Sequence, residues 1–302
     1  MKNVVITGGT GTVGKLLCDK LSQKGYAVFI LTRSKSIKIS KQLSFVHWDI
    51  SNGHIDKKFF PKGEFALMHL AGASVIENKW TEAYKQSIYS SRIDSIKLIL
   101  EKYGERCTYI ASASGSNYYF GPNTETYFEE SDPPNTHYFL GRVCKDWEKA
   151  ALKNNLNIPA AVLRTGTVLA QHGGAFAIWR KLANYFMLMP LGTGKQFVPW
   201  IHVEDLCEMY VYCLEHQLTG AFNAVADEQI RHEDLLAQIA STMKRPLLPN
   251  LLPNAFLKLI LGKRAKLLLN GAQISNDKIQ QAGFKFRYPK IKAALGQLLT
   301  KS

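Results

Sequence analysis

Three glycines near the N-terminus, Gly8, Gly11 and Gly14, follow an apolar run at residues 4–6 with three-residue spacing. A buried strand that breaks into glycines and then enters a helix is typical of a site for the pyrophosphate of a dinucleotide. Gly8 would allow the sharp turn, Gly11 would leave room for the phosphates, and Gly14 would let the helix pack closely on the sheet. The next helix, predicted at residues 15–24, would offer free N–H groups and a partial positive charge. We expect the following residues to line this site: Gly8, Thr10, Gly11, Thr12, Val13 and Gly14.

The end of the second predicted strand, residues 27–32, indicates which dinucleotide binds. Proteins selective for NAD usually place an Asp or Glu here, which accepts hydrogen bonds from the ribose 2′-hydroxyl. This chain has no acid between Lys20 and Trp48, and Arg33 instead supplies a guanidinium suited to a 2′-phosphate. The sequence therefore predicts NADP(H) in preference to NAD(H). The alternative is that Arg33 belongs to an exposed basic loop.

Further strand ends carry residues for the rest of the cofactor. After the predicted strand 44–47, Asp49 would accept a hydrogen bond from the adenine amino group, and Ile50 would cover the ring. Ser112 closes the predicted strand 107–112 and would lie beside the nicotinamide. Small residues at the end of the predicted strand 65–70 would let the backbone approach the adenosine ribose, and we expect contacts from Leu70, Ala71 and Gly72.

Strand and helix patterns alternate over the first two thirds of the chain. Further strands are predicted at residues 3–7, 160–164 and 220–224, and long helices at 81–103 and 138–154. This alternation predicts the α/β class, with a Rossmann-type, doubly wound parallel sheet. We expect residues 1–165 to form the dinucleotide-binding core, to which the late strand near 220–224 returns. Residues 166–302 would form a smaller, mostly helical substrate lobe, with a helix at 255–270.

Length and composition exclude several classes of protein. A chain of 302 residues, 46% of them hydrophobic, can bury the core of one large α/β unit with a smaller lobe. No apolar run approaches the roughly 20 residues of a membrane span. The first strand begins almost at Met1, so we expect no targeting segment. Five cysteines without a Cys-x-x-Cys pair argue against a disulfide framework and a zinc site, and predict buried thiols in the reducing cytoplasm.

The positive charge is concentrated near the C-terminus. The net charge is +14, and from Pro249 onward there are ten Lys or Arg against one acid, Asp277. Such a segment suits nucleic acid, an anionic membrane or an anionic substrate. Its bases alternate with Leu, Ile and Phe at helical spacing, and it contains no nucleic-acid motif. We expect a solvated basic face and no nucleic-acid partner, with an anionic substrate or partner as the alternative; the oligomeric state stays open.

The order of these motifs resembles that of the extended short-chain dehydrogenases/reductases. The likeness continues through Ser112-Ala113-Ser114 and through residues 163–164 and 200–206. More narrowly, the chain is similar over its whole length to the epimerase family proteins, a branch also named as nucleoside-diphosphate-sugar epimerases or cell-division-inhibitor-like proteins. The segments that carry this narrower resemblance are residues 70–74, 79–85, 91–93, 143–148, 164–166, 173–175 and 282–289.

The catalytic pair of the wider superfamily is missing from this chain. Active members carry Tyr-x-x-x-Lys on the helix after the fifth strand, where the ammonium lowers the pKa of the phenol on the same helix face. Aligned on Glu148, this chain has Leu140 in place of the Tyr and Cys144 in place of the Lys. Leucine carries no proton to give, and a neutral thiol adds no positive charge. Catalysis would therefore need another proton donor.

Other residues are candidates for catalysis and substrate contact. The resemblance implies that the Ser114 hydroxyl hydrogen bonds a substrate carbonyl or alcohol. Tyr138, with Arg142 one turn later, is the nearest substitute for the pair. Its two-residue offset turns it about 200° around the helix, away from the nicotinamide, unless the helix begins later. The candidates for substrate contact are Trp80, Tyr118, Tyr119 and His202. For the two tyrosines the alternative is packing within a loop. For the histidine it is a hydrogen bond at the start of a helix.

These observations favour an atypical NADP(H)-binding oxidoreductase or epimerase that acts on an unidentified small molecule. The alternative is a binding protein without catalysis that couples NADP(H) occupancy to a partner through the basic C-terminal segment. A fully active sugar-nucleotide epimerase ranks third, because that reaction depends on the missing tyrosine.

Overall fold

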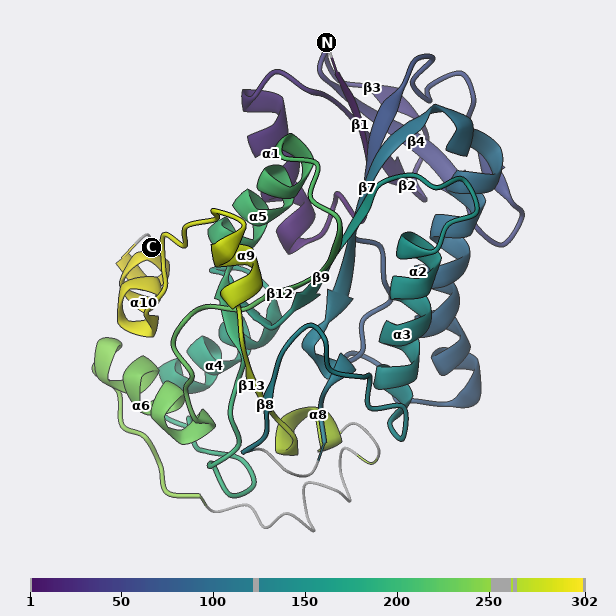
Figure 1. The fold of residues 1–302 in the computed structure, drawn as a ribbon. Coiled ribbons are helices and arrows are strands. Elements are labelled where there is room, and N and C mark those ends of the chain that lie inside the picture. The colour runs from purple at the N-terminus through teal and green to yellow at the C-terminus, as the bar shows by residue number, and fades with distance from the viewer. Residues whose placement is uncertain (1, 122–124, 251–261, 263–264, 301–302) are drawn as a thin grey trace.

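A central sheet arranges the chain, and it has the predicted α/β, Rossmann-type class (Figure 1). The computed structural model describes residues 2–121, 125–250, 262 and 265–300. Within them the sheet has nine strands, and every pairing is parallel except those of β3 and β5 with β4. From one edge to the other the strands are β12 (Gly220–Ala224), β9 (Ala160–Thr165), β7 (Cys107–Gly115), β6 (Phe65–His69), β1 (Asn3–Thr7), β2 (Ala27–Thr32), β4 (Leu43–Asp49) and β3 (Ile37–Lys38), with β5 (His54–Ile55) beside β4.

The parallel pairing brings the predicted site segments to one edge of the sheet. Thr7, the last residue of β1, is in register with Leu31 of β2 and with His69 of β6. The carboxyl ends of β1, β2 and β6 therefore lie side by side. The glycine loop, the Arg33 segment and the loop after β6 all begin at this edge.

The predicted strands are confirmed, and three of them run longer than expected, β9 by a single residue. β4 begins one residue earlier and ends two later than predicted, and β7 continues to Gly115. β7 is long because it stays in register with β9 as far as the pair Gly115 and Thr165. Ser114 is consequently part of the sheet and not of the following loop.

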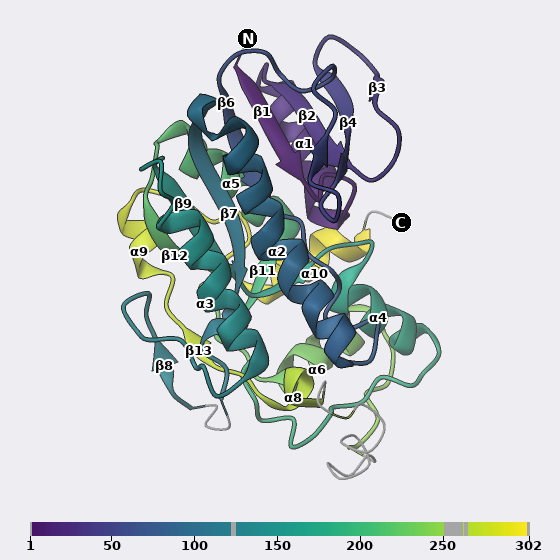
Figure 2. The same cartoon turned by 90° about the vertical axis from the view of Figure 1, so that its right-hand side faces the viewer.

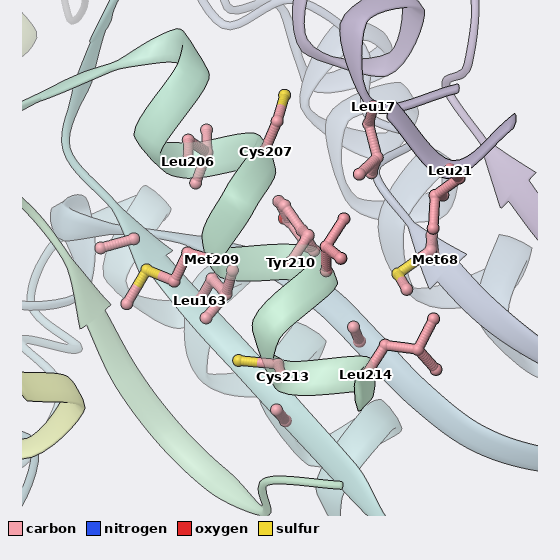
Figure 3. Close-up of a cluster of buried hydrophobic side chains, with 14 of the residues drawn as sticks. Leu17, Leu21, Met68, Leu163, Leu206, Cys207, Met209, Tyr210, Cys213 and Leu214 are labelled. Atoms are coloured by element: carbon pink, nitrogen blue, oxygen red, sulfur yellow. The ribbon is translucent and has the colours of Figure 1, made fainter. Parts of the chain in front are cut away.

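Helices cover both faces of the sheet. On one face α1 (Thr12–Gln23) packs beside α5 (Val203–Glu215), and on the other α2 (Glu82–Tyr103) runs beside α3 (Phe139–Leu152) (Figures 1 and 2). In Figure 3, Leu17 and Leu21 of α1 lie opposite Tyr210 of α5 within one buried cluster. This apolar contact fixes the start of α1, and with it the glycine loop, against the sheet.

A second set of helices forms the smaller lobe. Its core joins α4 (Gly174–Asn184), α6 (His232–Thr242) and α10 (Ile291–Thr300). The described part of the predicted helix 255–270 is α8 (Ala265–Leu269); residues 255–261 and 263–264 lie outside the described residues. The division at residue 165 stays a prediction, although α5 packs in the core of the sheet and not in that of the lobe. The remaining short elements are β8 (Tyr127–Phe128), β10 (Thr167–Leu169), β11 (Trp200–His202), β13 (Gln273–Ile274), α9 (Asp277–Gln281), η1 (Gly104–Arg106) and η2 (Ser116–Tyr118).

The described helices include none that is long and apolar enough to cross a membrane. All five cysteines are free and buried. Their burial matches the expectation that they serve as small apolar side chains.

Gly14 and Gly296 are both helical glycines, but only Gly14 lies against other backbone. A Cβ on Gly14 would collide with the carbonyl oxygen of Gly8, whereas a Cβ on Gly296 would meet nothing within 4 Å. We expect Gly14→Ala to lower the free energy of unfolding by about 1–3 kcal/mol through overpacking. Gly296→Ala should raise it by about 0.5–1 kcal/mol, because alanine favours a helix. Urea denaturation measures both, and a Gly14→Ala protein as stable as wild type would contradict the close packing.

Candidate functional site

The glycine loop is tied to the neighbouring strand end. The Thr7 hydroxyl accepts hydrogen bonds from the backbone N–H of Leu70 at 3.0 Å and of Ala71 at 2.9 Å. Gly8 has φ +70°, and a Cβ there would lie 2.8 Å from the carbonyl oxygen of Leu70. Glycine is therefore required at position 8 both by its backbone conformation and by the approach of the next loop.

The start of α1 leaves its first N–H groups open. Gly11 is the N-cap residue, no side chain caps the helix, and no acid lies in its first turn. The predicted helix start was three residues late, because Thr12, Val13 and Gly14 are already helical. An uncapped helix start of this kind leaves donors and a partial positive charge for an anion.

A second helix begins next to this one. Gly173, the N-cap residue of α4, has φ +85°, and a Cβ there would collide with the hydroxyl oxygen of Thr12. α4 also has no side-chain cap and no acid in its first turn. Two helix N-termini thus lie close together at the glycine loop, an arrangement that the sequence analysis did not predict.

The residues expected around the adenosine lie at the same edge. Arg33 is exposed and makes no hydrogen bond or ion pair with any described residue. The carboxylate of Asp49 accepts from the backbone of Ser51 and Asn52 and from the Asn52 amide, and the Asn52 amide contributes most to lowering the pKa of this carboxyl. Ile50 and Ala71 pack against the core between the sheet and α2. The Asp49 carboxylate thus holds a turn where the strand ends.

A buried histidine that the sequence analysis missed connects both helices to the sheet. His69 Nε2 lies 2.7 Å from Ser95 Oγ of α2, and the Trp147 indole of α3 donates to His69 Nδ1 at 3.1 Å. Ser112 is in register with His69 and lies 3.4 Å from the same Nδ1. Since the Ser95 hydroxyl donates to backbone carbonyls, His69 must carry its proton on Nε2. Burial, aided by the charge of Arg92, lowers the pKa of His69 to about 3.

Ser114 and Tyr119, two of the predicted site residues, belong to a second buried network. The Ser114 hydroxyl donates to Glu148 at 2.7 Å, and Arg164 binds both oxygens of Glu148 at 2.9 Å. Arg164 also donates to the Tyr119 hydroxyl, and its guanidinium lies 3.6 Å from the ring centre of Tyr118. The Ser114 hydroxyl therefore donates its hydrogen bond to a buried carboxylate, and not toward a bound substrate.

A cavity of about 230 Å³ lies at the start of α3. Tyr138 and Leu140 both line it, as do Trp80 and the cationic Arg142. α3 begins at Phe139, so Tyr138 is the N-cap residue in an extended conformation. Because Tyr138 lies outside the helix, the 200° offset does not apply to it, and it lines the same cavity as Leu140, the residue aligned above with the superfamily's tyrosine.

A larger hollow, of about 830 Å³, lies between α2 and α3 at the other edge of the sheet. It is lined by residues 104–106, which precede β7 at its amino end. The segments expected to bind the cofactor all follow the carboxyl ends of strands. This hollow lies at the amino ends and is therefore separate from them.

His202 connects the smaller lobe to α5. Its Nδ1 accepts from the backbone N–H of Glu204, and its Nε2 lies 3.0 Å from the Gln297 side chain of α10. Burial lowers the pKa of this imidazole. This is the helix-start hydrogen bond considered above. Within the described part of the chain, no group of three His, Cys, Asp or Glu side chains is placed to hold a metal ion.

The comparisons with known proteins agree with this geometry. The model of the NAD dependent epimerase/dehydratase family matches residues 4–224, and that of a domain of unknown function, DUF1731, matches residues 252–298. The chain therefore belongs to the NAD dependent epimerase/dehydratase family. Within it, the resemblance to the epimerase family proteins is confirmed by relatives along the whole chain.

Two of these relatives and one solved structure are similar to the chain over nearly its whole length. The chain is 32% identical to the chloroplastic epimerase family protein SDR39U1 homolog of Arabidopsis thaliana, over 98% of this chain and 86% of that one. It is 30% identical to an epimerase family protein of Staphylococcus aureus, over 100% of both chains. The crystal structure of human epimerase family protein SDR39U1 with NADPH has a TM-score of 0.88 at 24% identity, covering 99% of this chain and 100% of that one.

The low pKa of His69 predicts a pH-dependent stability. Between the ordinary histidine value of about 6.5 and about 3, the unfolded chain binds a proton that the folded chain does not. Stability therefore falls as the pH falls, by up to about 1.4 kcal/mol per pH unit. Burial also lowers the pKa of His202 and His232. The contribution of His69 is therefore measured by comparing wild type with a variant that lacks this histidine. We expect His69→Gln to show a shallower slope of unfolding free energy between pH 7 and 5; equal slopes would contradict a neutral, buried His69.

Proposed function

We propose that this protein binds NADP(H) in preference to NAD(H) and uses it in oxidoreduction or epimerisation of a small, anionic substrate. The observation that carries the proposal is the uncapped start of α1 at the glycine loop, beside the start of α4. A pyrophosphate bound there would accept hydrogen bonds from N–H groups that no described side chain satisfies. The human relative crystallised with NADPH supports the choice of cofactor.

The residues present fit such a cofactor. A Cβ on Gly11 would have only the Gly8 carbonyl oxygen nearby, at 3.3 Å, so the space above the loop stays open for phosphate. Arg33 is exposed at the end of β2, where a 2′-phosphate would lie. Asp49, Ile50, Leu70, Ala71 and Gly72 would then surround the adenosine. Ser112, predicted at the nicotinamide, is fully buried and its hydroxyl donates to the Ala113 carbonyl, so it does not fit that contact.

Among the described residues, Tyr138 is the proposed proton donor. The nicotinamide of a bound NADP(H) would supply or accept the hydride. Leu140 and Cys144 exchange no proton there, since the first is a hydrocarbon and burial raises the pKa of the second to about 11. Ser114 donates to Glu148, and Tyr138 lines the cavity together with Trp80. Arg142 gives that cavity the positive charge that an anionic substrate would need, whereas Lys85, which also lines it, is paired with Glu82 at 2.6 Å.

The burial of Leu140 and Cys144 also favours a second candidate, an NADP(H)-responsive binding protein without catalysis. The two candidates differ in one measurement. A catalyst should oxidise NADPH with a carbonyl substrate panel at a rate that Tyr138→Phe lowers by about 10²–10⁴-fold. Turnover that Tyr138→Phe leaves unchanged would contradict the role of Tyr138, and NADPH binding without any turnover would favour the binding protein.

Arg33 should determine the choice between the two dinucleotides. Losing a charge-assisted contact costs about 1.5–3 kcal/mol, so Arg33→Ala should weaken NADPH binding roughly 10- to 150-fold. Binding of NADH, which has no 2′-phosphate, should stay as in wild type and serves as the control. Fluorescence titration of both reduced cofactors measures this. Equal wild-type affinities for NADPH and NADH would contradict the assignment.

Gly173 and Gly25 form a matched pair for testing the second helix start. Both have φ +85°, but a Cβ on Gly25 meets nothing within 4 Å, whereas one on Gly173 collides with Thr12. Alanine is strained at both positions because φ is positive, and at Gly173 the ψ of 173° adds to the strain, so the stability of each variant is measured beside its NADPH affinity. We expect only Gly173→Ala to weaken NADPH binding as well, because it displaces Thr12 at the phosphate site. If both variants bind NADPH like wild type, the start of α4 has no part in the site.

A further inference from the structure

Arg92 of α2 places a cation at the edge of the sheet where the cofactor segments meet. The side chain is half-buried, and its guanidinium lies 5.0 Å from the ring centre of Trp147. One nitrogen, Nη1, donates to the carbonyl oxygens of Ala73 at 3.1 Å and Ile88 at 2.9 Å. Two backbone carbonyls and an indole thus hold the guanidinium in one orientation.

The rest of this guanidinium has no partner in the described chain. Nε and Nη2 make no hydrogen bond to a described residue, and none of the ion pairs among those residues includes Arg92. Arg164 differs, because Glu148 neutralises it with two hydrogen bonds. Burial lowers the pKa of the Arg92 guanidinium, because the charge is partly removed from water, and Cys144 and Tyr84 oppose this. A cation kept in this state has donors available for an anion.

The guanidinium packs on the loop that follows β6. A Cβ on Gly72 would lie 2.7 Å from Arg92 Cζ and 2.8 Å from Nη2, so glycine is needed there because the guanidinium packs on it. The cation is also near Cys144. Burial raises the pKa of that thiol, Glu148 adds to the increase, and the charge of Arg92 opposes it. Arg92 therefore brings a positive charge close to the position where the superfamily carries its lysine.

We propose that Arg92 is a substrate-binding residue, whose Nε–H and Nη2–H bind a carboxylate of the substrate. The inference rests on the proposed function and names its substrate class, a small carboxylic acid. Arginine does not give up its proton in proteins, so Arg92 neutralises and orients the substrate and takes no part in proton transfer. In this proposal Arg92 of α2 supplies the positive charge that the lysine of the Tyr-x-x-x-Lys pair supplies from α3 in the superfamily.

Arg106 provides a matched control. Its Nη1 also donates to two backbone carbonyls, those of Pro61 and Lys62 at 2.7 Å, and its guanidinium lies 5.1 Å from the ring centre of Tyr103. It lies at the opposite edge of the sheet, just before β7. Arg106→Met therefore removes the same kind of contacts away from the proposed site.

The experiment titrates the NADPH-saturated protein with benzoate, and with the uncharged benzamide, by calorimetry. Wild type and Arg106→Met should bind benzoate with the same affinity and benzamide at least 10-fold more weakly. Arg92→Met should lose about 10- to 100-fold in benzoate affinity, and Arg92→Lys should lose less. Benzoate binding that is absent from wild type, or unchanged in Arg92→Met, would overturn the inference. Failure of wild type to bind NADPH would instead contradict the proposed function.

A thermal measurement tests the position of the charge without any ligand. Cys144→Lys should lower the melting temperature strongly in wild type, because it buries a second cation near Arg92. The same change should lower it less in an Arg92→Met background. Equal decreases in both backgrounds would contradict the placement of the Arg92 charge beside position 144, and with it the inference.

Discussion

The buried ion pair between Glu148 and Arg164 determines how α3 sits on the sheet. Arg164 of β9 is in register with Ser114 of β7, and both hydrogen bond the Glu148 carboxylate from below the helix. Burial alone would lower the pKa of the Arg164 guanidinium, but Glu148 and Tyr119 outweigh it and raise the pKa. Breaking a buried pair of this kind typically costs about 3–5 kcal/mol. The rotation of α3 about its axis is therefore firmly set.

That rotation decides what each side chain of α3 can do. With Glu148 directed at the sheet, Trp147 reaches His69, Cys144 lies near Arg92, and Leu140 faces the cavity at the helix start. Leu140 and Cys144, which the sequence alignment predicts in place of the superfamily's pair, are both buried on this face. The groups proposed to act instead, Tyr138 and the Arg92 guanidinium, come from just before the helix and from the neighbouring helix.

Local sequence patterns predicted the sheet and the glycine loop because both depend on local physics. Apolar runs form buried strands, and Gly8 and Gly14 were expected from the turn and the helix packing that they allow. Residues that act through distant contacts could not be found this way. His69 reads as the end of a strand, Arg92 as one more cation in a helix, and Gly173 as a turn. Only the fold brings them to Trp147, Gly72 and Thr12. The predicted orientation of Tyr138 was wrong because α3 begins one residue later than predicted. Tyr138 is therefore the N-cap residue and not part of the helical repeat.

The central claim, that the glycine loop and Arg33 form a site for NADP(H), can be tested by competition. The purified protein is incubated with equal concentrations of NADPH and NADH, desalted, and examined by native mass spectrometry. The account predicts a single NADPH retained per chain and little NADH. Retention of NADH in equal or greater amount, or of neither nucleotide, would contradict it.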